Sequence, residues 1–215
     1  MILILLGRSG CGKTAIAKRL KKRHGYVQVK TCTTRDRRDG EAEDAYHFMT
    51  DEEFRRHIAA DDFAEFDTYG GHLYGTLKSS LSNPEEKYIC VVTPPGAEAI
   101  KEAFPDAFIV YVETDMKTSV MRSIAREKEL DPGKLYKLYV RACQDHLLFD
   151  HPACDFILPN PDGTNLEDAA KTCADEHLRY FLNFAVHDAT DTVKDCIMEL
   201  KAYNEKHAEE NKKGD

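Results

Sequence analysis

The chain has 215 residues, a length that predicts one sizeable domain. With 42% hydrophobic residues, its composition is that of an ordinary globular protein that can build a core. The formal net charge of −8 argues against a general nucleic-acid binder, because such a protein needs a basic face. It does not exclude a small anionic substrate, since a few arginines can dominate a cleft.

The cysteines and the N-terminus indicate a cytoplasmic protein. Seven cysteines are scattered without a CxxC pair, as is typical of reduced thiols. His146, His151 and Cys154 are close in sequence, but no fourth zinc ligand is evident. The apolar residues 1–6 are too few to span a membrane and lack the charged flank of a signal peptide. We expect no membrane partner and no nucleic-acid partner, and either a monomer or a homodimer.

Strands and helices are expected to alternate. Apolar runs, periodicity and capping residues predict, in chain order, a strand at 2–6, a helix at 13–23, a strand at 25–32, a helix capped by Asp51, strands at 88–93 and 108–113, helices at 116–130 and 134–149, and a strand at 155–159. Two further helical segments are expected after Gly163, one of them an amphipathic helix at 191–203. This alternation predicts an α/β fold, with a parallel sheet covered by helices on both faces.

The first strand runs into a phosphate-binding motif, Gly7-x-x-x-x-Gly12-Lys13-Thr14. Glycines let backbone N–H groups converge on a phosphate, and the following helix offers its positive N-terminus. Lys13 is expected to reach the outer phosphates, and the Thr14 hydroxyl to bind Mg²⁺. The predicted ATP-binding residues of this loop are Gly7, Ser9, Gly10, Cys11, Gly12, Lys13 and Thr14.

A second group of polar residues follows the second predicted strand. Arg35 and Arg38 offer forked donors for another phosphate. Glu65 is a carboxylate on an apolar segment, and Tyr74 and Thr76 place hydroxyls beside a glycine. Two phosphate sites predict the donor and the acceptor of a phosphoryl transfer.

Together these residues resemble the guanylate kinase family, in which a run TTRxxRxGE…YxF…FxE…YGT follows the P-loop. The resemblance covers roughly the first 160 residues and rests on Thr33-Thr34-Arg35, Arg38, Gly40-Glu41, Tyr46, Phe48, Phe63, Glu65 and Tyr74-Gly75-Thr76. It implies a P-loop kinase three-layer fold with a central parallel sheet, an inserted monophosphate-binding lobe and a helical lid. The implied boundaries are one domain over 1–215, with a core (1–30, 84–120 and 144–185), a lobe (31–83), a lid (121–143) and a helical C-terminal extension (186–215).

The implied activity is transfer of phosphate from ATP, with Mg²⁺, to GMP or dGMP. The resemblance implies that Glu65 and Thr76 contact guanine and that Asn160 lies near the base of ATP. The other implied substrate-binding residues are Thr31, Arg35, Arg38, Tyr46, Tyr74 and Thr93. The implied catalytic residues are Lys13, Arg35, Arg38 and three arginines of the lid, Arg122, Arg126 and Arg141. Charge on the transferring group would be offset by these cations.

One segment departs from the family pattern. The family carries D-x-D-x-x-G where this chain has Val91-Val92-Thr93-Pro94-Pro95-Gly96. A threonine hydroxyl is a weaker acceptor than a carboxylate, and valine is not a metal ligand. Two alternatives therefore stay open: a kinase of the same build acting on a different nucleotide or a phosphorylated sugar, and a non-catalytic binding module. Retention of Lys13 disfavours the module.

Overall fold

A computed structural model describes residues 1–37, 41–43, 45–127, 129–187 and 198. The chain divides into two compact units, Met1–His177 and Leu178–Asp215. In the second unit, residues 178–187 are helical, and the rings of Tyr180 and Phe184 stack with centroids 6.4 Å apart. The amphipathic helix predicted at 191–203 lies outside the described residues, apart from Met198.

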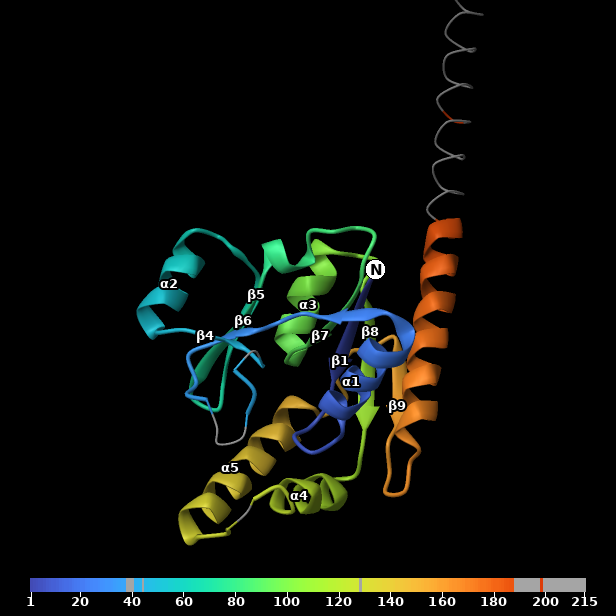
Figure 1. Ribbon diagram of the computed structural model, residues 1–215. Coiled ribbons are helices and arrows are strands. Elements are labelled where there is room, and N and C mark those ends of the chain that lie inside the picture. Colours follow the sequence, from blue (N-terminus) through green and yellow to red (C-terminus); the bar gives the residue numbers. More distant parts are fainter. Residues whose placement is uncertain (38–40, 44, 128, 188–197, 199–215) are drawn as a thin grey trace, which may run out of the picture. The chain divides into compact units, whose positions relative to one another are not determined.

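The first unit contains a five-stranded parallel sheet, as the alternating pattern predicts (Figure 1). The strand order is β2-β7-β1-β8-β9, and every pair in it is parallel. Bounds of these strands are Ile2–Leu6 for β1, Tyr26–Gln28 for β2, Lys87–Val91 for β7, Phe108–Glu113 for β8 and Phe156–Pro159 for β9. β1 is central and wholly buried, so its carboxyl end, where the phosphate-binding loop begins, is held rigidly.

Helices cover both faces of β1. Ile4 packs into a core cluster with Ile100 of α3 (Pro94–Ala103). Leu3 and Leu5 are also fully buried, and alternate residues of a strand point to opposite faces. The other helices are α1 (Lys13–His24), α4 (Met116–Ile124), α5 (Pro132–Leu148) and a helix starting at residue 166. No helix in the described part of the chain is long and apolar enough to cross a membrane.

Helix α3 was not expected from the sequence. The sequence pattern predicts strands at 88–93 and 108–113 and no helix between them. In the structure, Thr93 caps α3 and the two prolines occupy its first turn. Proline is favoured there because its missing N–H has no helical partner to lose.

The segment 31–83, here called the lobe, forms its own four-stranded sheet in the order β4-β3-β6-β5. Bounds are Cys32–Thr33 for β3, His47–Phe48 for β4, Phe63–Tyr69 for β5 and His72–Leu77 for β6. The strand expected at 25–32 is thus divided between two sheets, because the chain leaves the core after β2. A short 3₁₀ helix, Lys78–Leu81, leads back to the core.

Helix α2 (Asp51–Ala59) covers one face of the lobe sheet. Cys32, Phe54 and Phe63 form a small core there, with the two phenylalanine rings stacked at 4.5 Å. The capping residue is Thr50 rather than the expected Asp51, and Thr50 forms a capping box with Glu53. The opposite face of the sheet is left for polar side chains.

Candidate functional site

The phosphate-binding loop has a backbone that only glycine adopts easily. Gly10 and Gly12 have φ of 86° and 104°. A Cβ on Gly12 would collide with the Asn160 amide, and one on Gly10 would collide with the Ser119 carbonyl. These two contacts pack the loop tightly in front of α1, whose N-cap is Gly12 itself. The backbone N–H groups at this helix end are therefore available to an anion.

Lys13 and Thr14 occupy the first turn of α1. The Lys13 Nζ donates to the carbonyl oxygens of Gly7 and Arg8, so the ammonium lies over the loop. Thr14 is exposed. An ammonium above a loop of N–H donors is an arrangement suited to the outer phosphates of a triphosphate.

Asp145 of α5 links the loop to the lobe. Its Oδ2 accepts from the Ser9 backbone N–H at 2.7 Å, and its Oδ1 accepts from the Tyr69 hydroxyl at 2.6 Å. The Ser9 and Tyr69 hydroxyl oxygens are 3.1 Å apart. Burial, followed by the negative charge of Asp145, raises the pKa of Tyr69 well above its usual range. Tyr69 is therefore a neutral donor.

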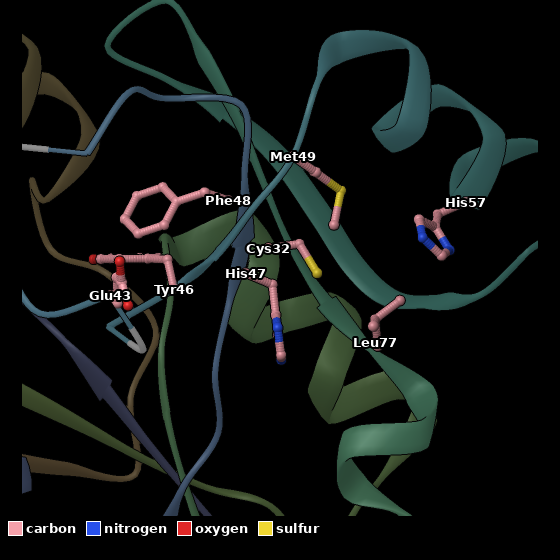
Figure 2. A pocket seen from close by; sticks show the side chains of 8 residues that line it. All are labelled: Cys32, Glu43, Tyr46, His47, Phe48, Met49, His57 and Leu77. Carbon is pink, nitrogen blue, oxygen red and sulfur yellow. The ribbon is translucent and has the colours of Figure 1, made fainter.

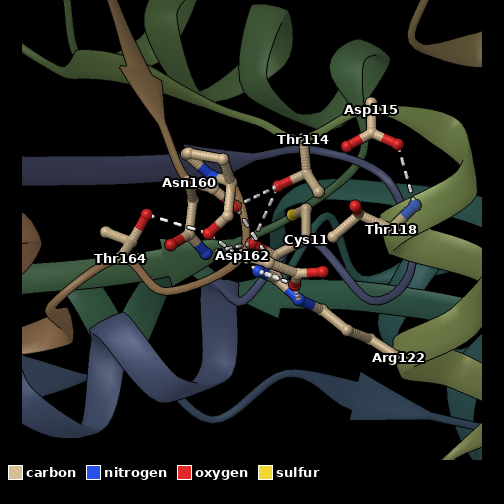
Figure 3. A network of polar contacts seen from close by, with 9 residues as sticks. Cys11, Thr114, Asp115, Thr118, Arg122, Asn160, Asp162 and Thr164 are labelled. Atoms are coloured by element: carbon tan, nitrogen blue, oxygen red, sulfur yellow. Dashed lines mark hydrogen bonds and ion pairs between the residues drawn. The ribbon is translucent and has the colours of Figure 1, made fainter.

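Asn160, directly after β9, lies against the phosphate-binding loop and supports it (Figure 3). Its Nδ2 donates to the Cys11 carbonyl at 2.6 Å, and the residue is 2% exposed. The Thr114 hydroxyl donates to the Asn160 carbonyl at 3.0 Å. The structure thus places Asn160 directly beneath the predicted ATP loop; its contact with the base of ATP stays a prediction.

The three arginines expected in a lid lie in different surroundings. Arg122 of α4 contacts Asp162 at 2.9 Å and donates to the carbonyls of Asn160 and Pro161 (Figure 3). Arg126 is exposed in the turn after α4, because the helix predicted at 116–130 ends at Ile124. Arg141 of α5 lies over the Tyr69 ring, 6.0 Å from its centroid. Of the three, Arg141 is the one placed beside the lobe.

A cavity of about 20 Å³ lies between the phosphate-binding loop and α4 and α5. Arg8, Ser9, Arg141 and Asp145 are among its lining residues. Arg8 also donates to the Thr114 carbonyl at 3.5 Å. Two guanidinium groups therefore lie beside the loop, of which sequence reasoning had singled out only Arg141.

The polar face of the lobe sheet carries Arg35, which is 8% exposed. Its guanidinium donates to both carboxylate oxygens of Glu41, at 2.9 and 3.0 Å. The same group lies 5.2 Å from the Tyr46 ring centroid, and the Tyr46 and Tyr74 rings are 6.3 Å apart. Arg38 is outside the described residues. The Thr31 carbonyl accepts from the His47 N–H, which fixes the start of this lobe.

A larger cavity of about 540 Å³ adjoins this face at the edge strand β4 (Figure 2). Tyr46 and Phe48 line one part of it, and they also contact Arg35. Cys32, Met49 and Leu77 line another part and belong to the packing beneath α2. The complete lining is Cys32, Glu43, Tyr46, His47, Phe48, Met49, His57 and Leu77.

Glu65 and Thr76 form a buried pair on the same polar face. They are directly opposite each other in the β5–β6 register, and the Thr76 hydroxyl donates to Glu65 Oε1 at 2.6 Å. Burial raises the pKa of Glu65 to about 7, against the lowering effect of the Thr76 hydrogen bond; the negative charge of Asp67 raises it further. A carboxylate that is 5% exposed and has no ion pair with a cation in the described part of the chain is costly, so the arrangement points to a ligand that donates hydrogen bonds.

The structure thus combines a phosphate-binding loop with a buried acceptor face on an inserted lobe. Asp145 connects the two. The sequence model described as "Guanylate kinase" matches residues 1–176. The chain belongs to the guanylate kinase family. That match covers the core sheet, the lobe and all the residues of the candidate site.

Individual guanylate kinases agree with this assignment. The enzyme from Thermotoga maritima is 32% identical over 179 residues, which is 79% of this chain and 82% of that protein. The one from Fusobacterium nucleatum is 33% identical over 127 residues, 57% of this chain and 69% of that protein. The solved guanylate kinase of Anaplasma phagocytophilum has the same fold, with a TM-score of 0.62 at 20% identity over 83% of this chain and 84% of that one.

In this guanylate kinase family member, the two departures from the family pattern are close to the site. Val91 ends β7 beside β1, and the register pairs it with Leu5. Thr93 caps α3, and its hydroxyl donates to Asp67 Oδ2 at 2.6 Å. Sequence reasoning missed Asp67, Tyr69 and Asp145. Their hydrogen-bond partners are 26 to 136 residues away along the chain, so no local sequence pattern predicts the role of these three residues.

Proposed function

We propose that this protein transfers the terminal phosphoryl group of ATP to GMP or dGMP, giving ADP and the nucleoside diphosphate. One observation carries the proposal: a complete phosphate-binding loop occurs together with a buried Glu65–Thr76 pair on the lobe. Guanine presents N1–H and an exocyclic amine, both of which donate to a carboxylate. We place the reaction in the cytoplasm, where both nucleotides are available.

The donor side is assigned to the loop and α1. Backbone N–H groups and Lys13 bind the β- and γ-phosphates, and Asn160 holds the loop in shape from below. Mg²⁺ would be held by the Thr14 hydroxyl together with triphosphate oxygens and water, a ligand set that suits this ion. Val91 supplies no ligand. Bound Mg²⁺ would help neutralise charge on the phosphates.

The acceptor side is assigned to the polar face of the lobe. Arg35 is held by Glu41, and its guanidinium lies 5.2 Å from the Tyr46 ring centroid, so it is proposed to bind the monophosphate. Tyr46 and Tyr74 would add hydroxyl contacts. Arg38 is proposed for the same phosphate from its place in the motif. No covalent intermediate is needed, since positioning and charge stabilisation carry such transfers.

Arg122, Arg126 and Arg141 are proposed to stabilise the transferring group once both nucleotides are bound. Arg141 already lies beside Tyr69 and the loop. Arg122 would have to leave Asp162, an exposed partner whose ion pair contributes little stability. Closure of α4 and α5 would therefore cost little at this contact.

A second candidate function is phosphorylation of a different acceptor. The residues Val91 and Thr93, which replace two aspartates of the family pattern, favour it. A binding module without catalysis has less support, because a module has no need for Lys13 above an open anion site.

A coupled assay of ADP release over a panel of acceptors tests these alternatives. The panel contains GMP, dGMP, AMP, CMP, UMP and a phosphorylated sugar, each with ATP and Mg²⁺. We expect the highest kcat/KM with GMP or dGMP. Turnover of another acceptor in preference to GMP would establish the second candidate, and absence of turnover with every acceptor would leave the binding module.

A further inference from the structure

Strand β5 places a second carboxylate beside Glu65. Glu65 is opposite Thr76 and Asp67 is opposite Tyr74 in the register, and residues two apart on a strand share a face. Burial alternates accordingly: Glu65, Asp67 and Tyr69 are buried or half-buried, whereas Phe66 and Thr68 are exposed. Asp67 therefore belongs to the acceptor face, next to the Glu65–Thr76 pair and opposite Tyr74.

The start of α3 meets both carboxylates. The Thr93 hydroxyl donates to Asp67 Oδ2 at 2.6 Å. Gly96, in the first turn, is so near to Glu65 that a Cβ there would lie 2.7 Å from Oε2. The positive end of a ten-residue helix favours negative charge at this place. The family pattern has an aspartate at position 93. In this chain Thr93 instead donates a hydrogen bond that orients Asp67.

The Thr93 hydroxyl already donates one hydrogen bond and accepts another within the protein. Its hydroxyl proton goes to Asp67, and its oxygen accepts the Gly96 N–H at 3.4 Å as the cap of α3. Asp67 keeps more capacity: Oδ1 accepts from the Thr68 N–H at 2.7 Å, Oδ2 accepts from Thr93, and each oxygen has a further lone pair.

The donor edge of guanine has three N–H groups, one on N1 and two on the exocyclic amine. One carboxylate in a forked arrangement accepts from N1–H and one amine hydrogen. We propose that Asp67 is the second carboxylate of the base site, accepting the other amine hydrogen, and that Thr93 is a positioning residue that holds it. This inference rests on the proposed GMP function and makes the 2-amino group the feature that Asp67 reads.

Comparison of GMP with IMP isolates that contact, because the hypoxanthine of IMP lacks only the 2-amino group. In Asp67→Asn, kcat/KM for GMP is expected to fall about tenfold or more, the loss of one charge-assisted hydrogen bond, while kcat/KM for IMP changes little. The GMP/IMP ratio therefore falls. Asp61→Asn, on an exposed aspartate of the same lobe, is the matched control and should leave the ratio unchanged.

Two variants at position 93 test the positioning role. Thr93→Val removes the donor to Asp67 and should raise the KM for GMP without changing kcat; Thr93→Ser should behave as wild type. The exchange Asp67→Ala/Thr93→Asp moves the carboxylate from β5 to α3 and should recover GMP preference lost in Asp67→Ala. Urea denaturation of each variant establishes that it is folded.

The outcomes separate this inference from the proposed function. An unchanged GMP/IMP ratio in folded Asp67→Asn, with GMP still the preferred acceptor of the wild type, would overturn the inference alone. Equal losses for GMP and IMP would also overturn it, because they would indicate a general distortion of the site. If the wild-type protein does not phosphorylate GMP, the proposed function fails first, and the inference fails with it.

Discussion

Glu65 is the residue on which the acceptor site depends most. It has no cation beside it among the described residues, and only Thr76 donates to it from a side chain. Burial raises its pKa to about 7, so in the empty protein near neutral pH a good part of the population carries a neutral carboxyl group. Guanine donors favour the ionised form. Binding of GMP should therefore release a proton from Glu65.

This linkage predicts a pH-dependent affinity for GMP. Below pH 7 the neutral form dominates, and the KM for GMP should rise by up to about tenfold for each further pH unit. Above pH 7 the KM should level off. Steady-state kinetics from pH 5.5 to 8.5 measure this, with the KM for ATP as the internal control. A KM for GMP that is flat across the range contradicts the assignment of Glu65 to the base.

Glu65→Gln removes the titration and replaces one acceptor oxygen by an amide that donates. We expect kcat/KM for GMP to fall by about a hundredfold or more, because a buried donor would then face the donors of guanine. The residual activity should have lost the pH dependence between 6 and 8. Full retention of activity would show that guanine binds elsewhere.

A substitution of Lys13 distinguishes the proposed kinase function from the alternative of a non-catalytic binding module. Lys13→Ala should abolish detectable transfer while the urea midpoint changes little, because the hydrogen bonds described for its ammonium go to the loop itself, to the Gly7 and Arg8 carbonyls and the Cys11 thiol. The ammonium also lies over the Phe149 ring, 6.0 Å from its centroid. Lys18→Ala, on the exposed side of the same helix, is the matched control. Near-normal turnover of a folded Lys13→Ala protein would exclude the mechanism proposed for the loop.

At the scale of elements, one carboxylate connects three of them. Asp145 of α5 binds Ser9 of the loop and Tyr69 of β5. Tyr69→Phe removes one donor from the 3% exposed Asp145 and keeps the ring on which Arg141 lies. We expect a loss of about 1–3 kcal/mol in the free energy of unfolding. Tyr136→Phe, an exposed tyrosine of α5, should change it by less than about 0.5 kcal/mol.

The same scale shows how far sequence reasoning reached. The core strands and the loop were predictable because continuous apolar runs and a spaced glycine motif are local signals. Helix α3 was not predictable, because two prolines are compatible both with the end of a strand and with the start of a helix. The β5–β6 hairpin was not predictable either, because the formation of short strands depends on the strands that they pair with. Glu65 and Thr76 stood out as polar residues, and their role at the base came from the family resemblance. Asp67 needed the structure, since its significance comes from the hydrogen bond of Thr93 at the start of α3.

At the scale of the whole first unit, two buried groups give opposite pH dependences of stability. His177 stacks on Phe108 with ring centroids 5.7 Å apart, and its Nδ1 is 2.9 Å from the Tyr26 hydroxyl. Burial, with the N-terminal ammonium and Lys87 nearby, lowers its pKa to about 4. Its stabilisation is therefore present above pH 6.5 and is lost as the pH falls through about 4. Glu65, with a raised pKa, loses its contribution as the pH rises through about 7.

Between about pH 4.5 and 6.5 the two effects have opposite slopes, so together these two groups leave the free energy of unfolding nearly flat there. His177→Phe, which keeps a ring against Phe108, removes the slope of His177, so the free energy of unfolding of the variant should rise relative to that of the wild type as the pH falls from 6.5 to 4. Urea titrations at half-unit steps of pH measure it. His146→Phe, on an exposed histidine, should leave the slope as in the wild type. If the free energy of unfolding of His177→Phe changed with pH as in the wild type, His177 would not contribute to the pH dependence.

The pairing of β2 with β7 has a consequence for how the chain folds and changes. Tyr26 pairs with Lys87 and Gln28 with Ile89, so residues 29–86 form a loop whose two ends are adjacent strands. Closing such a loop costs entropy that grows only logarithmically, by about 0.6 kcal/mol for each doubling of its length. The acceptor lobe can therefore lengthen or shorten in evolution at small cost to the core. The same long-range pairing is a slow contact to form, so closure of the core sheet between β2 and β7 should set the pace of folding.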